Sequence, residues 1–187
     1  MLRAFIEHRL RAAWQRRWPL AVLLWPLSRL YGALAARQRA VDASKAVRLS
    51  VPVGVVGNVI AGGAGKTPTT LAIVQHLKAR GWRPGIVSRG HGRAMDDCRE
   101  VGPGADPQDV GDEPLLLRRR ADVPVFVAPR RAEAGRTLLA AHPACDILVC
   151  DDGLQHVALA RDVEICVFDA RGIGNGWLLP AGPLRET

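Results

Sequence analysis

The stretch V-G-V-V-G-N-V-I-A-G-G-A-G-K-T runs from Val53 to Thr67 and joins a β-branched run, a glycine-rich loop and a Lys-Thr pair. A segment with helical periodicity follows it. Glycines let the backbone turn tightly, so successive N–H groups can point at phosphate oxygens, and the helix directs the positive end of its dipole at the same anion. The order predicts a phosphate-binding loop in which Lys66 reaches the β- and γ-phosphates and the Thr67 hydroxyl holds Mg²⁺.

This loop departs from the usual pattern at one position. Ile60 stands where a further glycine is usual, and the loop carries Gly57 and the pair Gly62-Gly63 instead. A plain glycine turn with an incidental Gly-Lys-Thr is the alternative interpretation. The flanking strand and helix patterns favour a nucleotide phosphate site.

Strand and helix patterns alternate along the rest of the chain. We expect helices over residues 67–80, 115–120 and 130–141, strands over residues 85–88, 123–127, 146–150 and 163–168, and a long loop over residues 89–109. Because the strands are near-continuous apolar runs, the pattern predicts an α/β fold with a mostly parallel sheet and helices on both faces. Ligands of such a fold collect at the C-terminal ends of the strands.

The excess of basic over acidic residues lies entirely in the first fifty residues. The 187 residues carry a net charge of +8; residues 1–50 hold ten Lys or Arg against two acidic residues, and the remainder balances at sixteen of each. The apolar run from Pro19 to Leu27 is shorter than the roughly 20 residues of a spanning helix, and Trp25, Arg29 and Tyr31 suit the headgroup level. We expect residues 1–50 to form an arm on an anionic membrane surface and residues 51–187 to form the nucleotide-binding domain.

Three other interpretations of the arm stay open. Ala33-Leu34-Ala35 resembles a signal-peptide cleavage site, although export would separate a nucleotide site from its nucleotide. The arm could also be a helix packed on the domain. A nucleic-acid arm is less suitable because the aromatic residues cluster with aliphatic ones, so no nucleic-acid partner is expected. The four cysteines show no C-x-x-C spacing, which indicates reduced thiols rather than a zinc or disulfide framework.

Carboxylates follow a predicted strand and open a predicted helix. Asp151 and Asp152 end the buried strand, where they would hold Mg²⁺ beside Thr67 unless they form only a solvated turn before Gly153. Asp112 is the candidate base for an acceptor hydroxyl, or alternatively an N-cap. Glu113 lies beside it.

Further polar residues are weaker candidates. Arg89 and Arg131 could meet phosphate charge or lie on the surface, and His156 is as compatible with a structural role as with a site.

Five motifs together resemble one family. They are G-N-V-I-A-G-G-A-G-K-T-P (Gly57–Pro68), S-R-G-H-G-R (Ser88–Arg93), V-G-D-E-P (Val110–Pro114), D-D-G-L-Q-H (Asp151–His156) and L-L-P-A-G-P-L-R-E (Leu178–Glu186). In this order they resemble the tetraacyldisaccharide 4'-kinases, bacterial enzymes that phosphorylate the lipid A precursor at the cytoplasmic face of the inner membrane. The resemblance covers roughly the first half of a full-length family member.

The resemblance implies a P-loop NTPase-like fold, an ATP–Mg²⁺ cofactor and transfer of the γ-phosphate to the 4'-hydroxyl of tetraacyldisaccharide 1-phosphate. It makes Asp112 the catalytic aspartate and Lys66 a further catalytic residue, and it places Thr67, Glu113, Asp151 and Asp152 at the metal. The implied ATP-binding residues are Ile60, Ala61, Gly62, Gly63, Ala64, Gly65, Lys66 and Thr67. Substrate or supporting roles fall to Asn58, Arg89, His91, Arg131, Gln155 and His156.

Two departures qualify this expectation. His91 stands where the family often has tyrosine, and the family's partner histidine lies in a later segment that these residues do not contain. We therefore expect a truncated product that binds nucleotide but transfers phosphate weakly or not at all. The alternative functions are a membrane-associated nucleotide switch, whose members often carry lysine at the position of Ala61, and a folded remnant without activity.

Overall fold

The computed structural model describes residues 14–186. Its contacts divide the chain into two compact units that interleave in sequence. One unit contains residues 14–41, 58–64 and 168–186, and the other contains residues 42–57 and 65–167. The division of the sequence at residue 50 into an arm and a domain stays a prediction.

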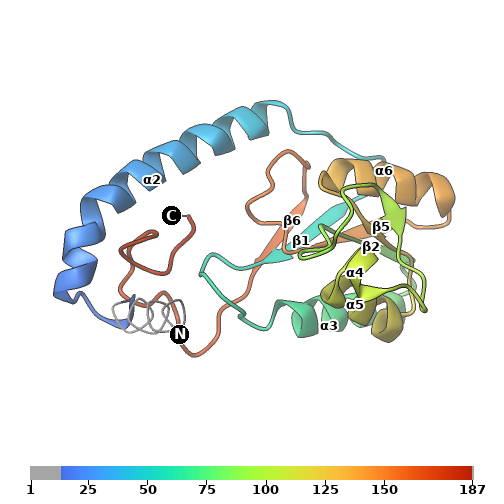
Figure 1. The fold of residues 1–187 in the computed structure, drawn as a ribbon. Coiled ribbons are helices and arrows are strands. Elements are labelled where there is room, and N and C mark those ends of the chain that lie inside the picture. Colours follow the sequence, from blue (N-terminus) through green and yellow to red (C-terminus); the bar gives the residue numbers. More distant parts are fainter. Residues whose placement is uncertain (1–13, 187) are drawn as a thin grey trace. The chain divides into compact units, whose positions relative to one another are not determined.

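The second unit is built on a six-stranded sheet (Figure 1). Its strands are β1 (Val53–Gly57), β2 (Pro84–Ser88), β3 (Arg99–Glu100), β4 (Val125–Val127), β5 (Ile147–Asp151) and β6 (Val163–Cys166), in the order β3-β4-β2-β5-β1-β6. Every neighbouring pair is parallel except β3 and β4. The mostly parallel sheet predicted from the sequence is confirmed.

Helices cover both faces of this sheet, as predicted. They are α3 (Lys66–Ala79), α4 (Pro107–Val110), α5 (Asp112–Ala121) and α6 (Arg131–Ala141). Successive side chains of a strand point to opposite faces, and β2 shows the result. Ile86 joins a core cluster with Val74 of α3 and Leu117 of α5. Its neighbour Gly85 faces Leu138 of α6, where an added Cβ would lie 2.7 Å from a methyl carbon.

Three local features differ from the expectations or alternatives drawn from the sequence. The predicted loop over residues 89–109 contains β3 and α4, which are too short for periodicity to reveal. Strand β6 is largely exposed because it lies at the edge of the sheet, so it is not a buried strand. Asp112 is the first residue of α5 and not its N-cap; Gly111 caps the helix with a φ of 90° and no side-chain bond.

The first unit contains most of the long helix α2 (Pro19–Ser44), which has Pro26 inside it. One stripe of α2 contacts the C-terminal segment: the Ser28 hydroxyl donates to the Leu178 carbonyl at 2.7 Å, and the Tyr31 hydroxyl donates to the Arg185 carbonyl at 2.9 Å. Arg39 forms an ion pair with Glu186. The helix therefore packs along the L-L-P-A-G-P-L-R-E motif.

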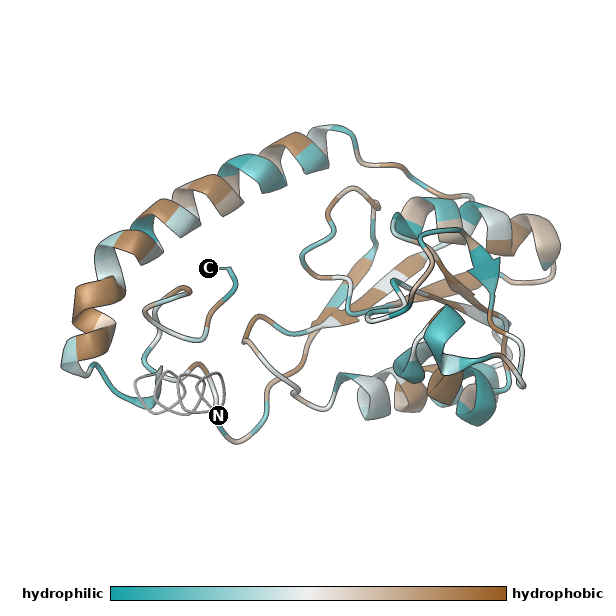
Figure 2. Ribbon diagram, viewed as in Figure 1, coloured by the Kyte–Doolittle hydropathy of each residue, from teal (hydrophilic) through white to brown (hydrophobic). Residues whose placement is uncertain are grey.

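A second stripe of α2 is apolar and exposed (Figure 2). Leu23, Leu27, Leu30 and Leu34 recur at helical spacing and are between 52% and 76% exposed. The apolar segment is longer than the run counted from the sequence, because the helix continues through Pro26. By length and composition alone, α2 would suffice to cross a membrane, which is also true of signal sequences.

Candidate nucleotide-binding site

Two carboxylates at the end of β5 contact the first turns of α3. The Lys66 ammonium lies 3.5 Å from Asp152 Oδ1, and the Thr70 hydroxyl donates to Asp151 Oδ1 at 2.8 Å. In the parallel register, Asp151 stands opposite Val56 of β1, the strand that leads into the glycine loop. Parallel neighbouring strands end at the same edge of the sheet, so this pairing brings the two motifs together.

The two aspartates differ in backbone and surroundings. Asp151 ends the strand and is 1% exposed, whereas Asp152 turns away with a φ of 49°, a left-handed conformation that non-glycine residues rarely adopt. Such strained residues concentrate at functional sites. Asp152 Oδ1 is buried and lacks a hydrogen-bond partner among residues 14–186, with only the ion-pair contact to Lys66.

Burial raises the pKa of Asp151 to about 6 from an ordinary 3.8. The hydrogen bond from Thr70 lowers this pKa, and the nearby negative charges of Glu113 and Asp152 raise it. The carboxylate is therefore held at a cost that a bound cation would relieve. Thr70 was not among the residues predicted from the sequence; its position one helical turn beyond Thr67 is the signal that could have identified it.

The pKa of Asp151 predicts that the parent chain loses stability relative to Asp151→Asn as pH rises from about 4 to about 6. In this window the folded chain retains a proton that the unfolded chain has released, so each rise in pH favours unfolding, by at most about 3 kcal/mol in total. Urea unfolding at pH 4.5 and 6.5, without nucleotide or Mg²⁺, measures the difference.

The comparison with the variant is needed because His156 also titrates in this window. Burial lowers the pKa of His156 to about 4, so its contribution to stability increases as pH rises, opposite to that of Asp151. Both chains contain His156, so its effect cancels from the difference. Parallel pH profiles for the two chains would contradict the prediction, and Asp122→Asn serves as the exposed control.

A buried arginine lies beside the aspartates. Arg131 begins α6 and is 5% exposed; its Nη2 donates to the Asp152 carbonyl at 3.0 Å, while Nε and Nη1 are buried without an oxygen or nitrogen partner in the described part of the chain. Burial lowers its pKa, and Arg89 and His156 lie near enough for mutual electrostatic influence. Three predicted residues thus gather around Asp152, with donors suited to an anion.

The glycine loop is distributed over both units. In the first unit, Gly62 has a φ of 102°, and Asn58 Nδ2 donates to the Gly62 carbonyl at 3.0 Å. In the second, Gly65 has a φ of 79° and caps α3 without a side-chain bond. No side chain caps the start of α3, so the positive end of its dipole can face an anion.

The remaining predicted residues show fewer contacts. Thr67 is the second residue of α3, and Glu113 in the first turn of α5 lies within electrostatic range of Asp151. Asp112 and His91 are exposed and form no hydrogen bond or ion pair with Asp151 or Asp152, and Gln155 is partly buried. Direct contacts thus join Lys66 and Arg131 to Asp152 and Thr70 to Asp151, whereas Asp112 and His91 have no such contact with the two aspartates.

The residues fit a polyphosphate with a divalent cation. Residues 14–186 contain no group of three or more His, Cys, Asp or Glu side chains arranged for a metal. Mg²⁺ needs no such group, because it is bound through one or two carboxylates together with substrate phosphates and water. The buried Asp152 oxygen, the Lys66 ammonium and the uncapped start of α3 are the matching donors and charges.

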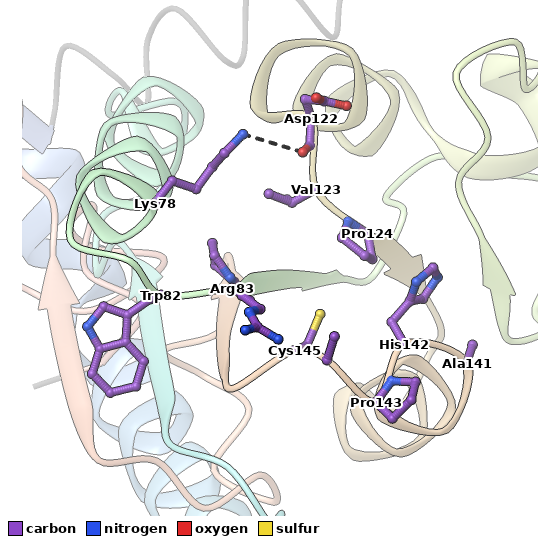
Figure 3. Close-up of a pocket in the computed structure, with 12 residues that line it drawn as sticks. Lys78, Trp82, Arg83, Asp122, Val123, Pro124, Ala141, His142, Pro143 and Cys145 are labelled. Atoms are coloured by element: carbon purple, nitrogen blue, oxygen red, sulfur yellow. Dashed lines mark hydrogen bonds between the residues drawn. The ribbon is translucent and has the colours of Figure 1, made fainter.

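Another cavity, of about 480 Å³, lies away from these residues (Figure 3). It is lined at the start of β2 by Trp82 and Arg83, and by residues around Val123 and Cys145. Its Lys78 ammonium is engaged by the Ala121 carbonyl at 2.9 Å, at the C-terminal end of α5. Helix C-termini carry partial negative charge, so this end of the sheet does not suit a polyphosphate.

Comparisons with known proteins show which family the chain resembles. A family model described as Tetraacyldisaccharide-1-P 4'-kinase (LpxK) matches residues 20–187. The tetraacyldisaccharide 4'-kinase of Acidovorax sp. (strain JS42) is 67% identical over 184 residues, which are 97% of this chain and 54% of that protein. The same-named protein of Delftia acidovorans is 62% identical over 180 residues, 95% of this chain and 53% of that protein.

A solved structure shares the fold. LpxK from Aquifex aeolicus, crystallised in complex with ATP, superposes with a TM-score of 0.78 at 31% identity, covering 90% of this chain and 55% of that chain. This chain therefore spans about half the length of the relatives it matches. The family model matches most of its residues, and the chain belongs to the tetraacyldisaccharide 4'-kinase family.

Proposed function

We propose that the chain contributes the ATP-binding and metal-binding half of a kinase that phosphorylates the 4'-hydroxyl of a tetraacyldisaccharide 1-phosphate. The observation that carries this proposal is the meeting of Lys66, at the uncapped start of α3, with Asp152 at the end of β5. A cation at a helix N-terminus beside carboxylates fits a triphosphate with its Mg²⁺. The family name supports the lipid disaccharide as acceptor.

The residues then take distinct roles. When bound, Mg-ATP supplies the phosphoryl group and the cation that neutralises it. Lys66 and the loop N–H groups bind phosphate oxygens, Thr67 and the two aspartates hold the cation, and Asp112 accepts the proton of the acceptor hydroxyl. Arg131 presents buried donors to negative charge beside Asp152.

The direct test is transfer of radiolabelled γ-phosphate from Mg-ATP to tetraacyldisaccharide 1-phosphate. We expect a lipid product from this chain joined to the C-terminal half of the Acidovorax relative. Lys66→Ala in the same chimera is the control. ATP hydrolysis without any phosphorylated lipid would contradict the kinase proposal and favour a nucleotide switch.

The exposed leucine stripe of α2 supports a membrane role. Leu23, Leu27, Leu30 and Leu34 share one stripe, while Ser28 and Tyr31 contact the C-terminal segment on another. A helix with one face packed and one apolar face exposed suits the interface of an anionic bilayer. We propose that α2 holds the protein peripherally at the cytoplasmic face of the bacterial inner membrane, where a lipid acceptor resides.

Leu23→Ser combined with Leu30→Ser should lower partitioning onto vesicles containing phosphatidylglycerol by at least about a hundredfold, because each buried leucine contributes roughly 1.5–3 kcal/mol. Vesicle co-sedimentation measures the partition coefficient. Leu116→Ser is the matched control, since Leu116 is an exposed leucine (43%) on α5. Equal partitioning of the double variant and the parent would refute the membrane role of this stripe.

A further inference from the structure

The guanidinium of Arg171 holds the backbone of the glycine loop. Arg171 Nη2 donates to the Gly63 carbonyl, and Nη1 lies 3.3 Å from where a Cβ on Gly62 would be. Arg171, Gly62 and Gly63 all belong to the first compact unit. No motif singled out Arg171 from the sequence, because it is more than a hundred residues from the loop.

Asp169 fixes the orientation of this guanidinium. Arg171 Nε lies 3.0 Å and 2.9 Å from the two carboxylate oxygens of Asp169, and the Arg171 backbone N–H donates to Oδ1 at 2.9 Å. The pair keeps both groups charged: it lowers the pKa of Asp169 and raises that of Arg171. A planar guanidinium that is held by several hydrogen bonds can direct its remaining donor in one direction only.

The loop carbonyls are engaged while neighbouring N–H groups are open. The Gly62 carbonyl accepts from Asn58 and the Gly63 carbonyl accepts from Arg171. Within residues 14–186, the N–H groups of Gly62, Gly63 and Ala64 have no acceptor. In a trans peptide the C=O and the following N–H point in opposite directions, so the bond to Gly63 turns the Ala64 N–H away from Arg171.

We propose that Arg171, clamped by Asp169, is a positioning residue that presets the peptide between Gly63 and Ala64 for polyphosphate binding. The inference rests on the proposed function and adds a residue pair to it. Open N–H groups in a glycine-rich turn form an anion-binding concavity, and holding the intervening carbonyl reduces the ordering that a ligand must induce.

A charge-neutralising substitution separates positioning from simple electrostatics. Asp169 is negative, so if it acted only through its charge, Asp169→Asn would strengthen the binding of Mg-ATP. Acting through Arg171, the same change frees the guanidinium and weakens binding. We expect about tenfold weaker Mg-ATP binding for both Asp169→Asn and Arg171→Ala by isothermal titration calorimetry. The double variant should be no weaker than Arg171→Ala alone.

Two further variants define the outcome. Arg171→Lys keeps the charge but not the planar fork, so it should restore little of the affinity. Arg48→Ala removes a comparable exposed pair, Arg48 with Asp162 at 2.8 Å, and should leave both binding and melting unchanged. Exposed pairs contribute little to stability, so thermal melting of the Asp169 and Arg171 variants should also match the parent.

The possible failures are distinguishable. If the 187-residue chain binds no Mg-ATP, the proposed function is overturned together with this inference. If Lys66→Ala weakens binding but Asp169→Asn strengthens it or leaves it unchanged, only the role of the Arg171 clamp is overturned.

Discussion

Lys66→Ala is expected to weaken Mg-ATP binding by about a hundredfold, the largest effect on affinity that the site predicts. The Lys66 side chain is only 11% exposed and begins at the start of α3, and its ammonium lies 3.5 Å from Asp152 Oδ1. Removing one charge-assisted contact from such a place costs about 3 kcal/mol, which corresponds to that factor. Titration calorimetry with Mg-ATP measures the dissociation constant.

Lys78→Ala is the matched control, because Lys78 lies at the other end of the same helix and donates to the Ala121 carbonyl. It should leave the affinity unchanged. The loss in Lys66→Ala also leaves Asp152 without its cation, so Lys66→Ala combined with Asp152→Asn shows how much of the loss is repulsion from that carboxylate. Unchanged affinity in Lys66→Ala would rule out this loop as the phosphate site.

Asp112→Asn is expected to reduce kcat for lipid phosphorylation by about 10²- to 10⁴-fold while Mg-ATP affinity stays within about twofold of the parent. The amide is nearly the same size as the carboxylate but cannot accept the proton of the acceptor hydroxyl. Asp112 is exposed at the start of α5 and forms no hydrogen bond with Asp151 or Asp152, so its carboxylate is open to an acceptor. The chimera with the Acidovorax half provides the assay.

Asp122→Asn tests the opposite end of α5 and should keep kcat, since Asp122 follows the helix in a left-handed conformation that asparagine tolerates. Glu113→Gln, beside Asp112, should instead change the Mg²⁺ dependence if Glu113 supports the metal. An Asp112→Asn chimera as active as the parent chimera would assign the base to another group.

Most of the fold could be predicted from the sequence, because short runs of neighbouring residues indicate the strands and helices. The β-branched run before Lys66, and the apolar strand before Asp151, each mark a parallel strand by composition alone. Strand β3 was not predicted because it has only two residues, Arg99 and Glu100, and is defined by their pairing with β4. The exposure of strand β6 was not predicted, because composition does not show which strand lies at an edge.

Some residues of the site could likewise be predicted from local sequence signals, and others could not. Lys66, Asp151 and Asp152 were predicted because a glycine loop and a strand end are visible in sequence, and the structure brings these residues together. Thr70 and Arg171 were not predicted, since each acts through a contact with a residue distant in the chain. Arg131 was predicted only as one of two possibilities, and its burial distinguishes it from a surface arginine.

The sequence by itself determined the phosphate-binding loop, the parallel α/β class and the carboxylates at a strand end, because backbone freedom at glycine and strand patterning are properties of neighbouring residues. Only the tertiary structure decided that Asp151 is buried against Thr70, that Arg131 lies beneath Asp152, and that Arg171 holds Gly63. These contacts depend on strand order and on which side chains become buried together. Burial and long-range pairing are set by packing, which no local pattern in the chain encodes.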